Sequence, residues 1–471
     1  MVGSLRDPGG RGSVEPTSPI TPGIRMKDSA SSAPATTIET ARTGPPRGAL
    51  LVIFLTVFID LLGFGIVLPV MPRQAGPYLE ALHLSPLAAG ATIGLLFSVF
   101  SLMQFVFSPI WGRWSDRVGR RPMLLLSLAG SVVFYALYGF AVTISPERAA
   151  LAIGLMMLAR IGAGIAGASV GTAAAVIADC TTPQNRSRGM ALIGIAFGAG
   201  FTLGPLIAYF GMKLFNDRPW AVGALASALS AVAFLFAFFV FRETRDPANR
   251  AGKEFFSVSR SARVLAIPAV GALVLIYFLS IFSFANFEAT LARLTEEAFG
   301  MSDDDNFLVF AGIGLVLMLA GGSYRPLAKR VSETRLLTIG LLLMAVGLAA
   351  VGAVAGIVHA NAGGQGLSSS WVRGLFYAAA GLSVWGFAFV NPSVSSLISR
   401  RSDPSAQGEV LGVNQSFASL GRILGPFCGS VLFTLHPSRV LPYAVAVVTL
   451  LGVLALVRRT TVVDRLPQGG A

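Results

Sequence analysis

The chain has 471 residues, of which 54% are apolar and only 13% are charged. Soluble domains carry about 25% charged residues, so this composition indicates lipid as the surrounding solvent and argues against a soluble enzyme. The net charge of +13 does not indicate a nucleic-acid partner, because the basic residues fall in short segments between apolar runs and form no stripe.

Residues 1–47 are rich in Ser, Thr, Pro and Gly and contain no apolar run, so we expect a disordered cytoplasmic tail rather than a signal peptide. Beyond this tail the sequence has twelve apolar stretches, each long enough to cross a hydrocarbon core of about 30 Å as a helix. The predicted spans are 49–71, 86–110, 122–144, 149–174, 188–210, 219–241, 264–288, 306–324, 335–358, 372–397, 407–433 and 440–457.

The basic residues are distributed unequally between the two sides that these spans define. One side, which includes both termini, holds 27 Lys and Arg residues, and the other side holds 7. Cytoplasmic segments of membrane proteins carry the excess of Lys and Arg. The sequence therefore predicts that both termini lie in the cytoplasm.

The polar segment 242–263 is the longest charged loop and follows the sixth span, so we expect a cytoplasmic linker between two six-helix bundles, 48–241 and 264–457. A second tail is predicted at 458–471. The halves resemble each other, because RSRGMALIGIAFGAGFTLGP and QGEVLGVNQSFASLGRILGP have equal length, end in Leu-Gly-Pro and begin 221 positions apart. Such internal repeats are common in secondary transporters, whose substrate site lies between the repeats.

The first span contains an acidic residue, Asp60, about 16 Å from its start at 1.5 Å per residue. An ionised carboxylate near mid-membrane costs about 2.5–3.5 kcal/mol on insertion scales, so intramembrane acids are usually functional. The alternative is a neutral or paired acid that only binds a neighbouring helix. Pro69 and Pro72 are expected to kink or end this helix.

The loop after the second span reads GRWSDRVGRRP, from Gly112 to Pro122. Glycine allows a tight turn with positive φ, and Asp116 is suited to capping a helix or pairing with arginine. A general excess of arginine in cytoplasmic loops explains the charge of this string but not its ordered spacing. The string resembles the signature loop of the major facilitator superfamily, in the form typical of twelve-helix drug:proton antiporters such as tetracycline-resistance efflux proteins.

This resemblance implies a charged latch that closes the two halves against each other on the cytoplasmic side. The residues to which it assigns this gating role are Gly112, Asp116, Arg117, Gly119, Arg120 and Arg121. The corresponding loop of the second half, YRPLAKRVSETRLL, has Lys329 and Ser332 in place of the aspartate and the second glycine. We therefore expect an asymmetric latch that depends on the first half.

Two further spans of the first half resemble family motifs. In the fourth span Arg160 lies about 16 Å deep, within a string similar to the family's arginine motif. There it either tunes a proton on Asp60 or forms a permanent brace with it. In the fifth span Gly200, Gly204 and Pro205 match part of the antiporter glycine-proline motif, which implies a kink and close helix packing.

The second half adds Glu288, expected near the outer end of the seventh span as a proton site or a solvated mouth residue, and Arg422, expected to pair or to bind an anion. Other polar residues predicted to face the cavity, or to make only interhelical hydrogen bonds, are Asn391, Asn414, Gln415 and Gln104. The 33 phenylalanines suit either a cavity for apolar solutes or contact with lipid.

The sequence thus predicts an all-α membrane protein of the major facilitator fold, with twelve transmembrane helices in two pseudo-symmetric bundles. The expected function is proton-coupled efflux of small organic, drug-like compounds by alternating access, as a monomer in the cell (inner) membrane. One alternative is an importer or facilitator of a metabolite such as an organic acid, with both buried arginines as anion ligands; another is a non-transporting receptor.

The expected partners are a small-molecule substrate, protons and the lipid bilayer. No GxxxxGK[ST] loop occurs, so ATP-driven transport is not expected. Cys180 and Cys428 form no CxxC motif or His/Cys cluster, so we expect no disulfide framework and no metal site. Neither a cofactor nor a nucleic-acid partner is predicted.

Overall fold

The computed structural model describes residues 49–169, 172–173, 176–177, 180, 186–244, 258–361, 370–402 and 407–463. All of these belong to one compact unit, Pro45–Ala471. The predicted tail 1–47, most of the predicted linker and the side chain of Asp60 lie outside the described residues.

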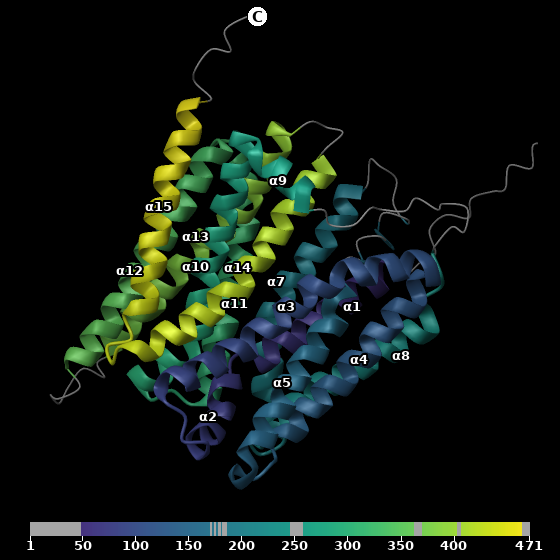
Figure 1. Ribbon diagram of the computed structural model, residues 1–471, viewed down its shortest axis with the longest axis vertical. Coiled ribbons are helices and arrows are strands. Elements are labelled where there is room, and N and C mark those ends of the chain that lie inside the picture. The colour runs from purple at the N-terminus through teal and green to yellow at the C-terminus, as the bar shows by residue number, and fades with distance from the viewer. Residues whose placement is uncertain are drawn as a thin grey trace, which may run out of the picture. The chain divides into compact units, whose positions relative to one another are not determined.

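The described part of the chain is almost entirely helical (Figure 1). In chain order the elements are α1 Ala49–Val67, α2 Met71–Ala81, α3 Pro86–Val118, α4 Arg120–Ala141, η1 Pro146–Arg148, α5 Ala149–Ala166, η2 Gly167–Ser169, α7 Arg186–Leu214, α8 Ala221–Val240, α9 Val258–Ala266, α10 Pro268–Phe299, α11 Asp303–Ala328, α12 Glu333–Ala360, α13 Ser370–Arg401, α14 Gln407–Leu435 and α15 Leu441–Val463.

Each predicted span overlaps one of these helices. Among the described residues, 10 helices are long and apolar enough to cross a membrane, or 11 if the bent pair α1 and α2 is one span. The count of twelve therefore stays a prediction. The helices extend furthest past the prediction in α3 and α10, which end at Val118 and Phe299, because hydropathy marks where apolar side chains end and not where backbone hydrogen bonding ends.

The first predicted span is bent near its end. The axes of α1 and α2 differ by 46° across the break that follows Val67. Pro69 lies in this break, and Pro72 lies in the first turn of α2, where its missing N–H costs no helical hydrogen bond. The prediction that these prolines kink or end the helix is confirmed.

The helices pack in two groups, which we call the first group (α1–α8) and the second group (α10–α15). In the first group α1 packs on α7, and α4 packs on α5 and α8. In the second group α12 packs on α13, and α10 packs on α14 and α15. The groups meet where α3 contacts α14 and where α7 contacts α11 (Figure 1).

Glycines bring the helix backbones close together where the groups meet. A Cβ atom on Gly94 of α3 would lie 2.8 Å from Phe427 Cα of α14, and one on Gly314 of α11 would lie 2.6 Å from Thr202 Cα of α7. Small residues at such contacts let helices approach within van der Waals distance, which is how membrane helices associate without a hydrophobic driving force.

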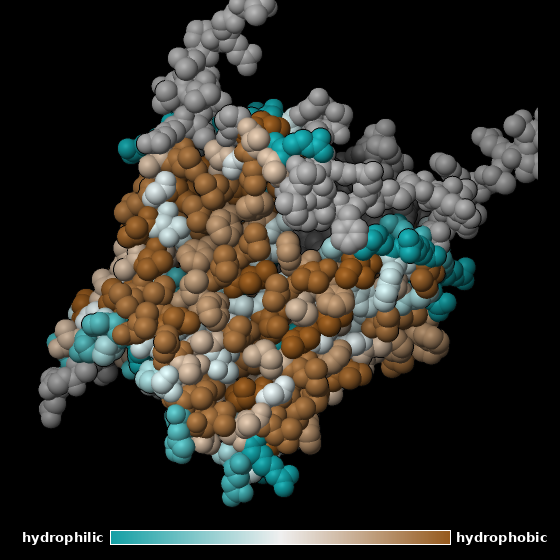
Figure 2. Space-filling model, in the orientation of Figure 1, coloured by the Kyte–Doolittle hydropathy of each residue, from teal (hydrophilic) through white to brown (hydrophobic). Residues whose placement is uncertain are grey.

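The outer surface suits lipid. Figure 2 shows apolar side chains over the flanks of the helices and hydrophilic ones mainly near their ends. Large apolar side chains that would be unfavourable in water, such as Phe239, Val448 and Phe210, are 78%, 70% and 67% exposed. Contact with lipid therefore accounts for part of the phenylalanine content.

Close packing of α4 on α8 predicts an effect of Gly223→Ala. A Cβ at this position would overlap the backbone of Gly139, so we expect the free energy of unfolding to fall by about 1–3 kcal/mol although alanine favours helices over glycine. Thermal unfolding of the purified protein measures this loss of stability. Gly154→Ala is the control, because its Cβ would meet nothing within 4 Å and should leave stability unchanged or higher. Equal behaviour of both variants would contradict the packing argument.

Candidate functional site

A buried arginine stands at the junction of three helices in the first group. Arg160 of α5 is 2% exposed, and its Nε donates a hydrogen bond to the carbonyl of Leu96 in α3 at 3.0 Å. Its guanidinium carbon lies 4.6 Å from the ring centroid of Phe100 in α3 and 5.5 Å from that of Phe64 in α1. The cation is thus held by one carbonyl and two aromatic faces.

The terminal nitrogens Nη1 and Nη2 of Arg160 are buried and have no hydrogen-bond partner among the described residues. A buried donor without a partner costs about 1–3 kcal/mol, and more when it is charged. A guanidinium presents these donors as a planar fork that matches a carboxylate or a similar anion. The site therefore has the chemistry to bind an acidic group in contact with aromatic rings.

The predicted partner of this arginine is Asp60. Its backbone is helical and lies one turn before Phe64 in α1, whose ring contacts Arg160. Because the side chain of Asp60 is outside the described residues, the interaction between the two residues remains a prediction.

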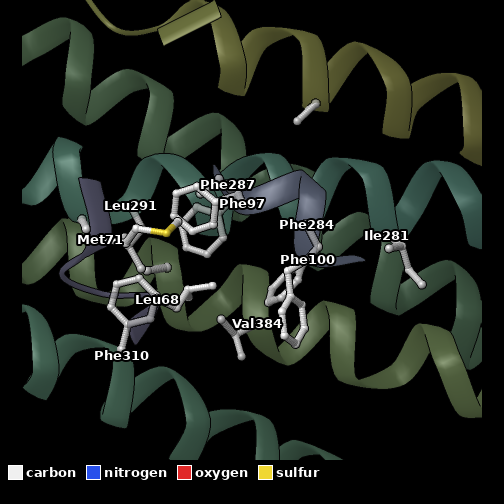
Figure 3. Close-up of a cluster of buried hydrophobic side chains, with 14 of the residues drawn as sticks. Leu68, Met71, Phe97, Phe100, Ile281, Phe284, Phe287, Leu291, Phe310 and Val384 are labelled. Carbon is white, nitrogen blue, oxygen red and sulfur yellow. The ribbon is translucent and has the colours of Figure 1, made fainter. Parts of the chain in front are cut away.

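Aromatic side chains from both groups lie in the same buried cluster as Phe100, which contacts Arg160. Phe64 lies 5.1 Å from Phe100 and 5.7 Å from Phe201 of α7, measured between ring centroids. In the second group, Phe284 of α10 stacks on Phe387 of α13 with centroids 3.8 Å apart. Phe100 and Phe284 belong to one cluster of buried side chains that continues across the two groups (Figure 3). These phenylalanines line the interior rather than lipid.

The glycine-proline motif of α7 packs against the turn of α1 that follows Asp60. A Cβ on Gly200 would lie 2.6 Å from Leu61 Cβ, and one on Gly204 would lie 3.1 Å from the Gly65 backbone. Pro205 lies inside the same helix. The close packing predicted for this motif is present, and it fixes the position of the helix that carries the acid.

Arg422 lies near the same level of the interface as Arg160. The hydroxyl of Ser98 in α3 donates to the carbonyl of Ile423 in α14 at 2.6 Å, next to Arg422 and two residues from the carbonyl that holds Arg160. Arg422 is half-buried, and its Nη2 donates to Ser419 Oγ at 3.1 Å. The two predicted arginines therefore lie on either side of the contact between α3 and α14.

Glu288 lies deeper than the sequence suggested. The placement near the outer end of its span is wrong, because α10 continues to Phe299, which adds about 16 Å of helix at 1.5 Å per residue. The side chain is half-buried and lies within electrostatic range of Arg422. This position favours a residue of the interior over a solvated mouth residue.

The predicted amide residues lie in three different surroundings. Gln104 Nε2 donates to the carbonyl of Gly167 in η2 at 3.1 Å, so this residue ties two helices of the first group together. Asn414 is fully buried, and neither of its side-chain polar atoms has a partner among the residues that the structure describes. Asn391 and Gln415 are exposed. The structure does not bring these amides together with Arg160.

The signature string is helical for most of its length, which differs from the loop expected from sequence. Helix α3 continues to Val118, and the turn consists of Gly119 alone, with φ of 118°. Gly112 lies inside α3 with nothing within 4 Å of its Cβ position. Of the two glycines, only Gly119 supplies a positive φ.

Charges within this string pair locally. Asp116 Oδ1 lies 2.6 Å from Arg120 Nη1, four residues along, and the same nitrogen donates to Ser115 Oγ at 2.7 Å. Arg121 donates to the carbonyl of Phe238 in α8 at 2.7 Å. Arg117 is exposed. In this conformation the aspartate is paired within the first group.

A residue that the sequence analysis missed, Glu243, caps α4. Its two carboxylate oxygens accept hydrogen bonds from the backbone N–H groups of Arg120 and Arg121 at 2.9 and 3.0 Å. A carboxylate at a helix N-terminus satisfies free N–H groups and complements the helix dipole. The only sequence signal is an acid directly after the sixth span, within a basic segment.

Comparisons with known proteins agree with this architecture. The sequence profile described as Major Facilitator Superfamily matches residues 53–363 and 273–470, which together cover most of the chain. The chain belongs to the major facilitator superfamily. It is therefore an integral, multi-pass membrane transporter, as the long apolar helices indicate.

Relatives of this transporter include proteins of two kinds. Major facilitator superfamily domain-containing protein 10 of Mus musculus is 29% identical over 447 residues, covering 85% of this chain and 90% of the relative. The class E tetracycline resistance protein of Escherichia coli is also 29% identical, over 388 residues, covering 80% and 86%.

Solved structures share the fold of this transporter. The human organic anion transporter MFSD10 (TETRAN) has a TM-score of 0.61 at 27% identity, covering 88% of this chain and 99% of that one. A D-xylose-proton symporter, at 20% identity and a TM-score of 0.67, covers 86% and 96% and shares the fold alone.

The cap on α4 predicts a local effect in this transporter. Removing the carboxylate by Glu243→Ala leaves the N–H groups of Arg120 and Arg121 without their acceptor. Loss of a cap costs about 1 kcal/mol, so these amides should exchange hydrogen for deuterium about five times faster by mass spectrometry. Glu80→Ala, an exposed acid at the end of α2, is the control and should leave this segment unchanged. Unaltered exchange in Glu243→Ala would disprove the capping role.

Proposed function

We propose that this chain exports small organic, amphipathic compounds in exchange for protons. The two groups of helices act as the two halves of an alternating-access carrier, and the solute binds between them near Arg160. Orientation follows from the excess of Lys and Arg on one side: both termini and the Asp116 string face the cytoplasm of a cell (inner) membrane. The chain works as a monomer.

The observation that carries the proposal is the buried guanidinium of Arg160, which lies beside two aromatic rings and has two nitrogens without a partner in the described part of the chain. A planar solute with an acidic group satisfies both features, because its ring stacks on phenylalanine while its anion meets the fork. Phe284 and Phe387 supply apolar contacts from the other group. The site therefore favours compounds that combine an aromatic body with a carboxylate or enolate.

Coupling to protons is assigned to Asp60. A carboxyl group inside a membrane segment gains and loses a proton as its surroundings change between wet and dry. A solute anion and the Asp60 carboxylate compete for the same cation, so binding of one favours release or neutralisation of the other. This competition links occupation of the site by a solute anion to the protonation of Asp60.

The named relatives support the proposal at the level of solute class. One kind carries the name of tetracycline resistance, and a solved structure is titled an organic anion transporter. Tetracycline and aromatic organic anions both present fused or linked rings with acidic oxygens, which is the chemistry suited to Arg160 and its phenylalanines.

Asp60→Asn tests the proton carrier. In liposomes with an imposed pH gradient and a trapped pH dye, the native transporter should accumulate tetracycline or carboxyfluorescein and move protons in the opposite direction. The variant should lose gradient-driven accumulation by at least about tenfold while downhill exchange continues, because the amide binds no proton at neutral pH. Glu147→Gln, an exposed acid outside the helices of the site, should behave as the native protein. Full coupling in Asp60→Asn would exclude Asp60 as the carrier.

Arg160→Lys tests the anion fork. Lysine keeps the charge but not the planar pair of donors or the stacking surface, so affinity for carboxyfluorescein should fall about tenfold. Affinity for a neutral aromatic probe of similar size should change less than threefold, since ring contacts persist. Binding measured by fluorescence polarisation separates the two. An equal loss for both probes would contradict a role in binding the acidic group.

The alternative is import or facilitated movement of an organic acid. The position of Arg160 and Arg422 on either side of the α3–α14 contact favours it, because two cations could bind one dicarboxylate. An uncoupler distinguishes the functions: collapse of accumulation supports proton exchange, and unchanged equilibration supports a facilitator.

A further inference from the structure

The two groups are joined by ion pairs at the end of the bundle opposite the Asp116 string. Arg73 of α2 lies 3.5 Å from Glu296 at the end of α10 and 3.4 Å from Asp303 at the start of α11. Its Nη1 also lies 3.3 Å from the carbonyl of Met301 in the connecting turn. One arginine of the first group therefore contacts both helices and the turn of the second group.

A second cation of the first group reaches the same turn from another helix. Lys213, in the last turn of α7, pairs with Asp304 at the start of α11. It also lies 3.3 Å from Asp217, in the segment that follows its own helix. Helices α2 and α7 thus present one cation each to neighbouring carboxylates of α11.

The acidic turn is held in shape by contacts within the second group. Gly300 adopts φ of 64° between α10 and α11, and Ser302 caps α11 in a reciprocal pair of hydrogen bonds with Asp305. Glu297 is paired with Arg439 at 2.6 Å. The remaining carboxylates, Glu296, Asp303 and Asp304, are those that face the first group.

We propose that Arg73 and Lys213, with Glu296, Asp303 and Asp304, form a clasp that holds this end of the transporter closed and must separate when the end opens. The clasp complements the Asp116 string, which lies at the other end. The signs are segregated, with cations on the first group and anions on the second, so movement of the groups breaks every pair together.

The strength of each pair suits a reversible contact. The side chains are between 29% and 47% exposed, and exposed ion pairs change an equilibrium constant by about 1.5- to 5-fold each. Three such pairs that break together bias the closed state by roughly 3- to 100-fold. This bias is large enough to favour one state and small enough for a solute or proton to overcome.

The alternative reading is that the acids only stabilise the start of α11. Acidic residues in a first turn complement the helix dipole, and that role does not depend on Lys213 or Arg73. Charge reversal distinguishes these two roles. Reversing one charge breaks the contact between the groups, and reversing the charge of its partner as well restores that contact.

The experiment measures the distance between spin labels at Thr143 and Asn361, which are exposed at this end of α4 and α12, in nanodiscs without substrate. Cys180 and Cys428 are first replaced by serine. Lys213→Asp and Asp304→Lys should each raise the ratio of long to short distances about fivefold, and the double variant should return this ratio to within twofold of the native value.

Asp217→Asn is the matched control, because it removes a carboxylate partner of Lys213 within the first group and should leave the distances unchanged. Single reversals without effect, or a double variant no closer to native than either single one, would overturn the clasp. The measurement needs no substrate or proton gradient, so its outcome is separate from that of the proposed function.

Discussion

The interior of the bundle depends on how the buried cation of Arg160 is stabilised among apolar helices. Arg160 is 2% exposed, yet of its nitrogens only Nε has an acceptor within the part of the chain that the structure describes. A charge inside a membrane helix costs about 2.5–3.5 kcal/mol on insertion scales. Two phenylalanine rings offset part of this cost, by about 0.5–2 kcal/mol each. The buried nitrogens without an acceptor add a cost of about 1–3 kcal/mol each, which an anion from a neighbouring acid or from a solute would offset, as the proposed binding role requires.

Close packing of helix backbones places the neighbouring side chains around this cation. Gly200 and Gly204 bring α7 against α1, so that α1 carries both Phe64 and Asp60 past the arginine. On the opposite side, the hydrogen bond from Ser98 to the carbonyl of Ile423 joins α3 to α14 at 2.6 Å. The centre of the bundle is therefore tied to both groups, and a change of charge there acts on the interface along which they move.

The sequence predicted the helices more completely than it predicted the contacts between distant residues. Each span predicted from hydropathy overlaps a helix because lipid imposes an apolar length, and the prolines after α1 located a bend because they remove backbone donors. Asp60, Arg160 and the Asp116 string were found because their residue types are costly or unusual in those places. The cap by Glu243 on Arg120 and the pairing of Arg73 with Asp303 were not found, since both join residues more than a hundred positions apart and only the fold brings them together.

The ion pairs at the two ends of the bundle differ in which helices they join. At one end Asp116 is paired with Arg120 at 2.6 Å within its own helical connection, inside the first group. At the opposite end, closure forms pairs between the groups that open to water when they part. Each exposed pair contributes about 0.2–1 kcal/mol, whereas neutralising a buried cation contributes several kcal/mol. The central charge therefore outweighs any single pair at the ends, which agrees with the proposal that binding at Arg160 shifts the balance between the two ends.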